Sequence, residues 1–164
     1  MEDPNLNNFV ISKITATEWK IYKRIRLEAL LDSPQAFATK YEDAVNRGSE
    51  SWKKQCSDME QGDSAFAFIG YLDNVPISLC GLYRNKTNFE EWEIVQVWTV
   101  KNFRGKGISE KMFVYAIDWA KNKNIKKLLA KVYSDNIRAK KFYEKMGFAV
   151  TKQVENEEWM YRNL

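Results

Sequence analysis

The fold of this chain of 164 residues is decided by the stretch Trp92-Glu-Ile-Val-Gln-Val-Trp-Thr-Val-Lys-Asn-Phe-Arg-Gly-Lys-Gly-Ile-Ser109. Residues 92–100 are apolar on both alternating faces, which is typical of a central strand covered on both sides. Apolar residues then recur at helical spacing over residues 107–122. The stretch therefore predicts a strand, a glycine-rich turn and a helix in direct succession.

The turn between this strand and helix has the composition of an anion-binding loop. Gly105 and Gly107 permit positive φ and a close approach of a ligand to the backbone. The first amides of a helix lack intrahelical partners, and the helix dipole adds about 0.3–1 kcal/mol of attraction for an anion. With Arg104 and Lys106 beside the glycines, the turn predicts a diphosphate site. The alternative is a glycine turn that serves geometry alone.

Two well-known phosphate loops do not match this turn. A P-loop requires Gly-x-x-x-x-Gly-Lys-Ser/Thr, which the segment lacks. A dinucleotide-binding fingerprint requires a third glycine at position 110, where the chain has Glu110, and several strand–helix–strand units, of which only one follows.

The remaining elements follow from where the apolar period changes between two and 3.6. Residues 15–18 have the pattern of a capping box, residues 34–49 have no clean period, and Asp73-Asn74 predicts a hairpin turn. Strands are predicted over residues 9–14, 65–72, 76–83, 92–100, 128–133, 148–154 and 158–162, and helices over 15–32, 51–60, 107–122 and 136–146. The sequence has no repeat or linker, so this order of elements predicts one α/β domain over residues 1–164, with residues 1–8 as a flexible tail. The strand–helix–strand unit over residues 92–133 is expected to be parallel and right-handed.

Composition excludes several classes of site. The chain has no histidine, which rules out a Ser-His-Asp or Cys-His nucleophile and a histidine-ligated metal; we predict no metal. Cys56 and Cys80 lie in different segments and are expected to be reduced and structural, as in a cytoplasmic protein. The net charge of +4, from 26 basic and 22 acidic residues, is too small to indicate nucleic acid. No apolar run is long enough to span a membrane, and the polar start has no secretory signal.

Three blocks carry a resemblance to a known family. The turn fits the signature Arg/Gln-x-x-Gly-x-Gly/Ala through Arg104 and Gly107, although Ser109 stands where the signature has Gly or Ala. Residues 134–148 combine Asn136, Tyr143 and a Gly-Phe pair, and residues 26–37 contain Arg-Leu-Glu-Ala-Leu and Ser-Pro-Gln-Ala-Phe. In these blocks the chain resembles the GNAT superfamily of acetyl-CoA-dependent N-acetyltransferases, as a small single-domain bacterial-type member.

The resemblance implies a fold and an activity. The fold is a single α/β domain with a mixed, mostly antiparallel sheet, one parallel strand pair and helices on both faces. The activity is acetyl transfer from acetyl-CoA, a co-substrate, to a primary amine of a small molecule or to an amino-terminal group. The alternative is a non-catalytic acyl-CoA-binding or regulatory module. The residues expected to bind the cofactor are Val97, Trp98, Thr99, Val100, Arg104, Gly105, Lys106, Gly107, Ile108, Ser109, Asn136 and Lys141.

The same resemblance suggests catalytic groups. Tyr143 is the candidate general acid, with a plain core tyrosine as the alternative. Glu93 is the candidate base, acting through water, because its apolar neighbours would raise the pKa of its carboxyl. Two alternatives to Glu93 as the base are that Gln96 orients a water and that solvent alone takes the proton. A backbone amide near Val97 or Trp98 would polarise the thioester carbonyl.

The acceptor is less well defined by the sequence. Acidic residues in 31–63 and in the last hairpin hint at a cationic acceptor such as a polyamine or aminoglycoside, although ordinary surface charge explains them as well. Trp159 and Tyr161 are candidates for a homodimer contact, and neither a nucleic-acid nor a membrane partner is expected. The acidic residues concerned are Glu42, Asp43, Glu50, Glu155, Glu157 and Glu158.

Overall fold

The computed structural model describes residues 6–164. Of the tail predicted over residues 1–8, residues 1–5 lie outside the described part. Leu6–Asn8 form a short 3-10 helix (η1), and the Asn8 side chain donates a 2.7 Å hydrogen bond to the Asp73 carboxylate. The chain is therefore attached to the sheet from residue 6 onward.

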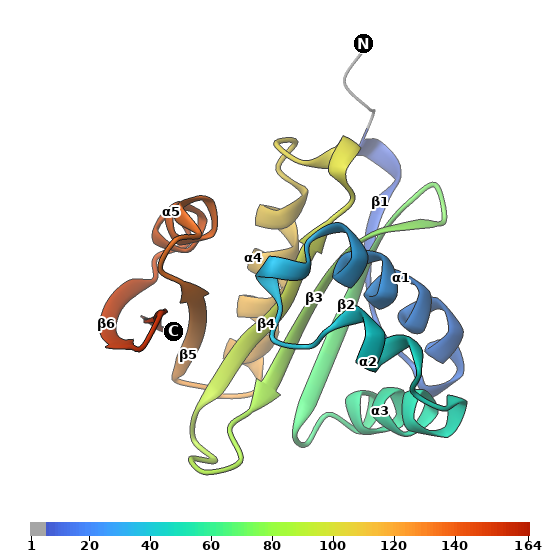
Figure 1. Ribbon diagram of the computed structural model, residues 1–164, viewed down its shortest axis with the longest axis horizontal. Coiled ribbons are helices and arrows are strands. Elements are labelled where there is room, and N and C mark those ends of the chain that lie inside the picture. The colour runs from blue at the N-terminus through green and yellow to red at the C-terminus, as the bar shows by residue number, and fades with distance from the viewer. Residues whose placement is uncertain (1–5) are drawn as a thin grey trace.

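The described strands form one seven-stranded sheet in the order β1-β2-β3-β4-β5-β7-β6 (Figure 1). Neighbouring strands are antiparallel except for β4 and β5, which are parallel. This confirms the mixed, mostly antiparallel sheet with one parallel pair. The strands are β1 (Phe9–Lys13), β2 (Ala65–Leu72), β3 (Val75–Arg84), β4 (Trp92–Thr99), β5 (Lys127–Tyr133), β6 (Ala149–Val154) and β7 (Glu157–Asn163).

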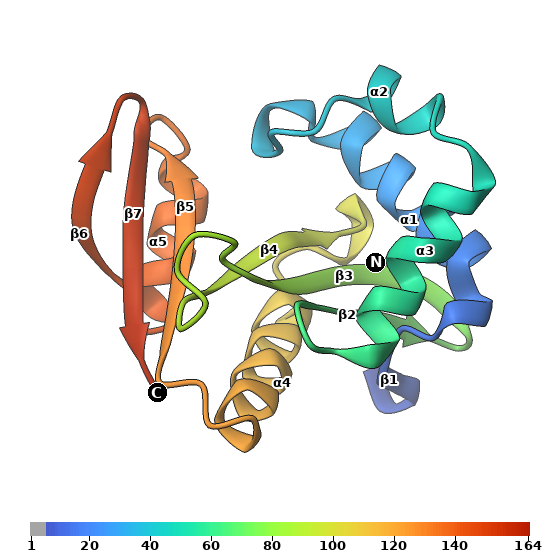
Figure 2. The same ribbon diagram turned by 90° about the horizontal axis from the view of Figure 1, so that it is seen from below.

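Helices cover both faces of this sheet (Figure 2). One core lies under α1 and α3 and includes Tyr22 and Trp52, and the other lies under α4 and includes Phe66 and Phe113. Helix α5 packs on the α4 side, where Phe142 meets Phe113 edge-on at 4.9 Å between ring centroids. The helices are α1 (Trp19–Asp32), α2 (Tyr41–Val45), α3 (Ser49–Gln61), α4 (Ile108–Asn122) and α5 (Ile137–Lys145), with 3-10 turns η2 (Ala16–Glu18), η3 (Pro34–Ala36) and η4 (Lys101–Phe103).

Local signals in the sequence act as expected at several element ends. The Glu18 carboxylate accepts the Thr15 backbone N–H at 2.9 Å, as a capping box requires. Asp73 and Asn74 have φ of 49° and 64°, the positive values of a tight hairpin turn. Gly147 follows α5 with φ of 82°, the left-handed conformation that glycine adopts at helix ends.

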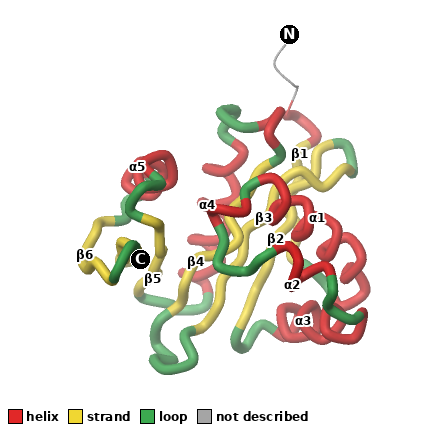
Figure 3. Tube along the Cα trace, in the orientation of Figure 1, coloured by secondary structure: helices red, strands yellow, loops and turns green. Residues whose placement is uncertain are grey.

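The structure adds three observations that the sequence pattern does not show. Residues 34–49, which show no apolar period, contain the short helix α2. The segments before and after α2 are loops that lie in front of the sheet in the view of Figure 3. Trp52 of α3 is 0% exposed and lies in the core. Trp159 and Tyr161, the candidates for a dimer contact, are half-buried, and Tyr161 donates a 2.9 Å hydrogen bond to Glu91.

Among the described residues, no helix has the length and apolar character needed to cross a bilayer.

Strands β4 and β5 pair over a very short distance. Their register includes only Trp92 with Leu128 and Glu93 with Leu129, and beyond these pairs the strands separate (Figure 1). The described part of the chain therefore places no strand beside the rest of β4 on its β5 side. A divergence of this kind leaves backbone amides and carbonyls of β4 free to bind an extended ligand.

Strand β4 also contains a bulge where the divergence begins. Leu79 pairs with Trp98 and Gly81 with Val95, so two residues of β4 face one residue of β3. Gln96, one of the two, has φ of 57°. Bulges of this type redirect side chains, and this one turns the Gln96 side chain toward α1, where it bonds to Tyr22.

Candidate functional site

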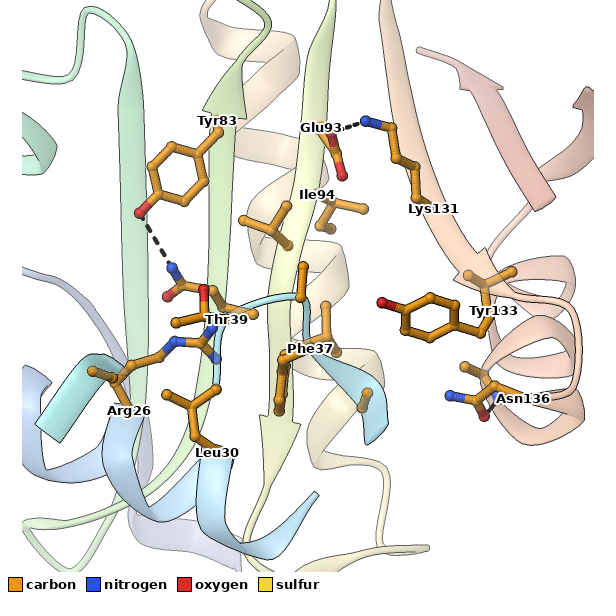
Figure 4. A pocket seen from close by; sticks show the side chains of 18 of the residues that line it. Arg26, Leu30, Phe37, Thr39, Tyr83, Glu93, Ile94, Lys131, Tyr133 and Asn136 are labelled. Atoms are coloured by element: carbon orange, nitrogen blue, oxygen red, sulfur yellow. Dashed lines mark hydrogen bonds and ion pairs between the residues drawn. The ribbon is translucent and has the colours of Figure 1, made fainter. Parts of the chain in front are cut away.

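Two adjoining pockets occupy the space opened by the divergence of β4 and β5. The first, which we call the tyrosine pocket, has a volume of about 540 Å³ and lies between α1, β3, β4 and β5 (Figure 4). The second, the glycine-turn pocket, has a volume of about 370 Å³ and lies between β4, the N-terminus of α4 and α5. Their linings share Val97, Asn136 and Tyr143, so the pockets meet beside the free edge of β4.

The glycine turn closes the second pocket with an open backbone surface. Gly105 and Gly107 have φ of 79° and 78°, and a Cβ built on either would meet no atom within 4 Å. The Lys111 N–H donates to the Gly107 carbonyl at 3.1 Å at the start of α4, and the amides of the first turn before Lys111 have no carbonyl within the helix to bind. The turn therefore has both the free donors and the empty space that a diphosphate requires.

Ser109, the departure from the signature, has a structural role. Its hydroxyl lies 3.0 Å from the Thr99 hydroxyl, which lies 3.0 Å from that of Ser78. The Ser78 hydroxyl also donates to the Trp98 carbonyl at 2.8 Å. This chain of hydroxyls joins the start of α4 to the end of β4, so the serine side chain turns toward the strand and its backbone amide still lies in the turn.

Arg104 holds the glycine turn against α1. Its Nε donates to the Thr99 carbonyl at 2.8 Å, and its guanidinium also pairs with Asp32, which accepts a 2.9 Å hydrogen bond from the Trp98 indole. Burial tends to raise the pKa of Asp32, but hydrogen bonds from Ser33, Trp98 and Arg104 lower it to about 2. The Arg104 side chain is thus engaged within the protein rather than directed at a phosphate.

Most of the predicted cofactor-binding residues lie together in the glycine-turn pocket. Val100, Lys106 and Lys141 belong to the lining of neither pocket, and Lys141 is exposed. Arg138 of α5, a further basic residue, lines the glycine-turn pocket. The predicted residues that line it are Val97, Trp98, Thr99, Arg104, Gly105, Gly107, Ile108, Ser109 and Asn136.

Tyr143 lies at the junction of the two pockets. Its ring packs against Phe113 and Phe148, with centroids 5.6 and 5.9 Å apart, and its hydroxyl makes no hydrogen bond to any described residue. Burial raises the pKa of Tyr143 well above its ordinary value, and the charges of Cys80 and Glu93 raise it further. The hydroxyl is therefore protonated at neutral pH and available to an occupant of the pockets.

Asn136, at the same junction, caps α5. Its side-chain oxygen accepts the Ala139 N–H at 3.1 Å, as an N-cap residue does. Because it lines both pockets, its amide nitrogen is the part of the side chain left for a ligand.

Glu93 lines the tyrosine pocket and has a partner that the sequence does not indicate. Its carboxylate lies 3.0 Å from the Lys131 ammonium of β5, and its side chain is 25% exposed (Figure 4). Burial raises the pKa of Glu93, although the hydrogen bond and charge of Lys131 act in the opposite direction. The direction of the shift agrees with the expectation from its apolar neighbours.

Gln96, the alternative to Glu93, is already fully engaged. Its amide oxygen accepts the Tyr22 hydroxyl at 2.9 Å, and its amide nitrogen lies 3.2 Å from the Tyr83 hydroxyl. Gln55 donates to both tyrosines, at 3.1 and 2.8 Å. This network uses the polar atoms of Gln96 for structure and leaves Glu93 as the carboxylate facing the junction.

The acidic residues that hint at a cationic acceptor do not gather in either pocket. Of the six, only Glu157 lines the tyrosine pocket; Glu50 pairs with Lys53 at 2.7 Å and Glu158 with Lys140 at 2.8 Å. The sequence interpretation missed the basic side of the pocket. Arg26 lies on the buried stripe of α1, next to Ile25, and a charged residue on an apolar stripe is the signal that could have found it.

Comparisons with known proteins identify the family of this chain. The model of the family described as Acetyltransferase (GNAT) family matches residues 23–148. N-alpha-acetyltransferase 30 of Schizosaccharomyces pombe is 33% identical over 61 residues, which are 37% of this chain and 41% of that protein. The chain spans less than half the length of the curated relatives that it matches.

Solved structures share the whole fold. PaiA N-acetyltransferase from Thermoplasma acidophilum, in complex with coenzyme A, has a TM-score of 0.79 at 16% identity, covering 95% of this chain and 99% of that one. YncA from Salmonella typhimurium, with its cofactor acetyl-CoA, has a TM-score of 0.78 at 16% identity, covering 96% and 95%. Because the family model spans most of the chain, the protein belongs to the GNAT family of acetyltransferases.

Proposed function

We propose that this protein transfers an acetyl group from acetyl-CoA to a primary amine of a small molecule or to an amino-terminal group. The observation that carries the proposal is the meeting of the two pockets at Val97 and Tyr143, beside the free edge of β4. One pocket ends on the glycine turn, and the other contains Glu93. Two proteins of the same fold hold coenzyme A or acetyl-CoA, which supports the choice of cofactor.

The chain offers a separate binding surface to each part of such a cofactor. The backbone amides of the glycine turn, from Gly105 to Ser109, would bind the diphosphate. The free edge of β4 at Val97–Thr99 would pair with the pantetheine amides as an added strand would, and one amide there would polarise the acetyl carbonyl. Acetyl-CoA supplies an acetyl group activated as a thioester.

Proton movement in this proposal falls to two side chains. Glu93, ionised, accepts the proton that the acceptor amine loses, directly or through water. Tyr143 holds its hydroxyl proton toward the leaving sulfur. Because the negative charge of Glu93 contributes to the raised pKa of Tyr143, neutralising Glu93 makes the Tyr143 hydroxyl more acidic at the stage where its proton is needed. Proton uptake by Glu93 therefore favours the later proton transfer from Tyr143 to the sulfur.

Glu93→Gln is expected to lower kcat/KM by about 10²-fold or more and to remove the rising limb of its pH profile. A base acts only when ionised, so activity rises as pH passes the Glu93 pKa, which burial raises above 4.5. Steady-state rates measured from pH 5 to 9 test this. A limb that persists in Glu93→Gln would assign the base to another group.

Two further variants serve as controls. Lys131 lowers the Glu93 pKa, so Lys131→Met should move the rising limb to higher pH without abolishing it. Glu157→Gln removes a second carboxylate from the same pocket and should leave the limb in place.

A direct assay distinguishes the transferase from the alternative, a non-catalytic acyl-CoA-binding module. Purified protein is incubated with acetyl-CoA and a panel of small amines and short peptides, and thiol release is followed with a chromogenic disulfide. Amine-dependent release supports the transferase. Saturable binding of acetyl-CoA, measured by calorimetry, without release for any amine would favour the binding module.

A further inference from the structure

The tyrosine pocket contains a buried cation that forms no hydrogen bond or ion pair with any described residue. Arg26 of α1 is 7% exposed, and its Nη1 atom is buried without a hydrogen-bond partner. Its guanidinium lies 4.5 Å from the centroid of the Phe37 ring and points between Phe37 and Tyr83 in Figure 4. Among the described residues, Arg26 forms neither a hydrogen bond nor an ion pair.

A second arginine lies near the first. Arg47 also lines the tyrosine pocket, and its charge acts on Arg26. Its guanidinium stacks 4.1 Å from the centroid of the Trp52 ring and bonds to the Gln55 side chain at 2.9 Å and to Ser51, which are neutral groups. In the part of the chain that the structure describes, no carboxylate pairs with either arginine. This end of the pocket therefore has two positive charges and no counter-ion.

Two arginines without a paired anion raise the free energy of the folded protein when the pocket is empty. A buried guanidinium loses its hydration, and the loss is compensated when its N–H groups bind an anion. Burial lowers the pKa of Arg26; the neighbouring Tyr22 and Tyr83 act against this shift, and the positive charge of Arg47 adds to it. Arginine donates two parallel N–H bonds and so suits carboxylate and phosphate groups.

The opposite wall of the pocket has the reverse character. Glu93 and Glu157 line it, and Lys131 balances only one of these two charges (Figure 4). An ammonium group would be favoured on this wall, close to the proposed base, and an anion on the wall of Arg26. The pocket is thus polarised between α1 and the β5–β7 side.

We infer that the acceptor is a small amine that also carries an anionic group, a carboxylate or a phosphate, and that Arg26 together with Arg47 binds this anion while the amine lies toward Glu93. This inference rests on the proposed function, because it names the substrate class of the same site. It replaces the polyamine or aminoglycoside suggested by six acidic residues, of which only Glu157 lines the pocket.

The test compares acceptors that differ only in the anion. Glycine, β-alanine, 4-aminobutyrate and 6-aminohexanoate are each paired with the corresponding carboxamide, and O-phosphoethanolamine with ethanolamine, at saturating acetyl-CoA. At least one anionic acceptor should have a kcat/KM about 10- to 100-fold above that of its neutral partner. The carboxylate and phosphate arms decide which anion is preferred. Equal values across all pairs would overturn the inference.

Arg26→Gln and Arg47→Gln then locate the anion site. Within each variant, KM for the preferred acceptor should rise by about 10- to 100-fold relative to the KM for its neutral partner. Arg26→Lys should restore part of the preference, since it keeps the charge. Because acid and amide are compared within one variant, partial unfolding affects both equally. A preference that survives in both glutamine variants would contradict the assignment.

A binding measurement separates failure of this inference from failure of the proposed function. Calorimetric titration of the same acid and amide pairs into the protein without acetyl-CoA does not depend on turnover. Tighter binding of the acids, weakened by Arg26→Gln, supports the anion site even if no acetyl transfer occurs. If amines are acetylated but acids and amides bind equally, the function stands and the anion site is refuted.

Discussion

Tyr143→Phe is expected to lower kcat by about 10²–10⁴-fold while the affinity for acetyl-CoA changes little. The substitution removes only the hydroxyl, which lies where the two pockets meet and bonds to no described residue. The ring contacts with Phe113 and Phe148 remain, so the stability of the fold should be preserved. Single-turnover rates and calorimetric binding of acetyl-CoA measure the two effects separately.

Tyr133→Phe is the matched control for this variant. Tyr133 of β5 lines the tyrosine pocket but not the glycine-turn pocket, and its hydroxyl points into the tyrosine pocket (Figure 4). We expect Tyr133→Phe to change kcat by less than about tenfold. Unchanged turnover in Tyr143→Phe, or an equal loss in both variants, would remove Tyr143 from the role of general acid.

Gly107→Ala is expected to weaken acetyl-CoA binding by about 10- to 100-fold. A Cβ at this position would enter the open space over the turn, where no protein atom lies within 4 Å, and so would displace an anion from the free amides. Loss of one hydrogen bond to a charged group costs about 1.5–3 kcal/mol, and 1.4 kcal/mol corresponds to a tenfold change in affinity. Gly107→Val, with a larger side chain, should abolish detectable binding. Calorimetry with coenzyme A and acetyl-CoA measures both.

Gly147→Ala separates this effect from backbone strain. Gly147 has φ of 82°, close to the 78° of Gly107, and lies after α5 outside the lining of both pockets. Its added Cβ would make only an ordinary contact, 3.5 Å from Arg162. Both alanine variants should lose about 1–2 kcal/mol of stability in denaturant unfolding, because a left-handed conformation disfavours L-residues. Only Gly107→Ala should lose affinity, and equal losses in both would argue against the anion cradle.

The elements along the chain could be predicted because their signals are local. The hairpin at Asp73-Asn74 requires two positive φ values, and the apolar period marks β2 over the same residues, 65–72, that the structure assigns. Helix α2 escaped prediction since five residues with one buried side chain, Ala44, have no detectable period. Tertiary contacts rather than sequence pattern stabilise such short helices.

The candidate site was predictable only where its groups belong to one stretch of chain. The glycine turn and Asn136–Tyr143 are contiguous, and most of their predicted members line the pockets. The partners of these groups were not predictable because they come from distant elements. Lys131 meets Glu93 across two strands, and Asp32 meets Arg104 from the end of α1. Ion pairs of this kind follow from the packing of the sheet and leave no local pattern.

By itself the sequence determined the strand–turn–helix at residues 92–122, the order of the elements and the membership of a family, because backbone propensity and glycine conformation act within a few residues. Only the tertiary structure decided what the cleft contains. The separation of β4 from β5 after two residue pairs opens the space. The packing of α1 against the sheet places Arg26 inside this space, where no carboxylate among residues 6–164 pairs with it. Those features depend on the global twist and on contacts between distant segments, which no single stretch of the chain encodes.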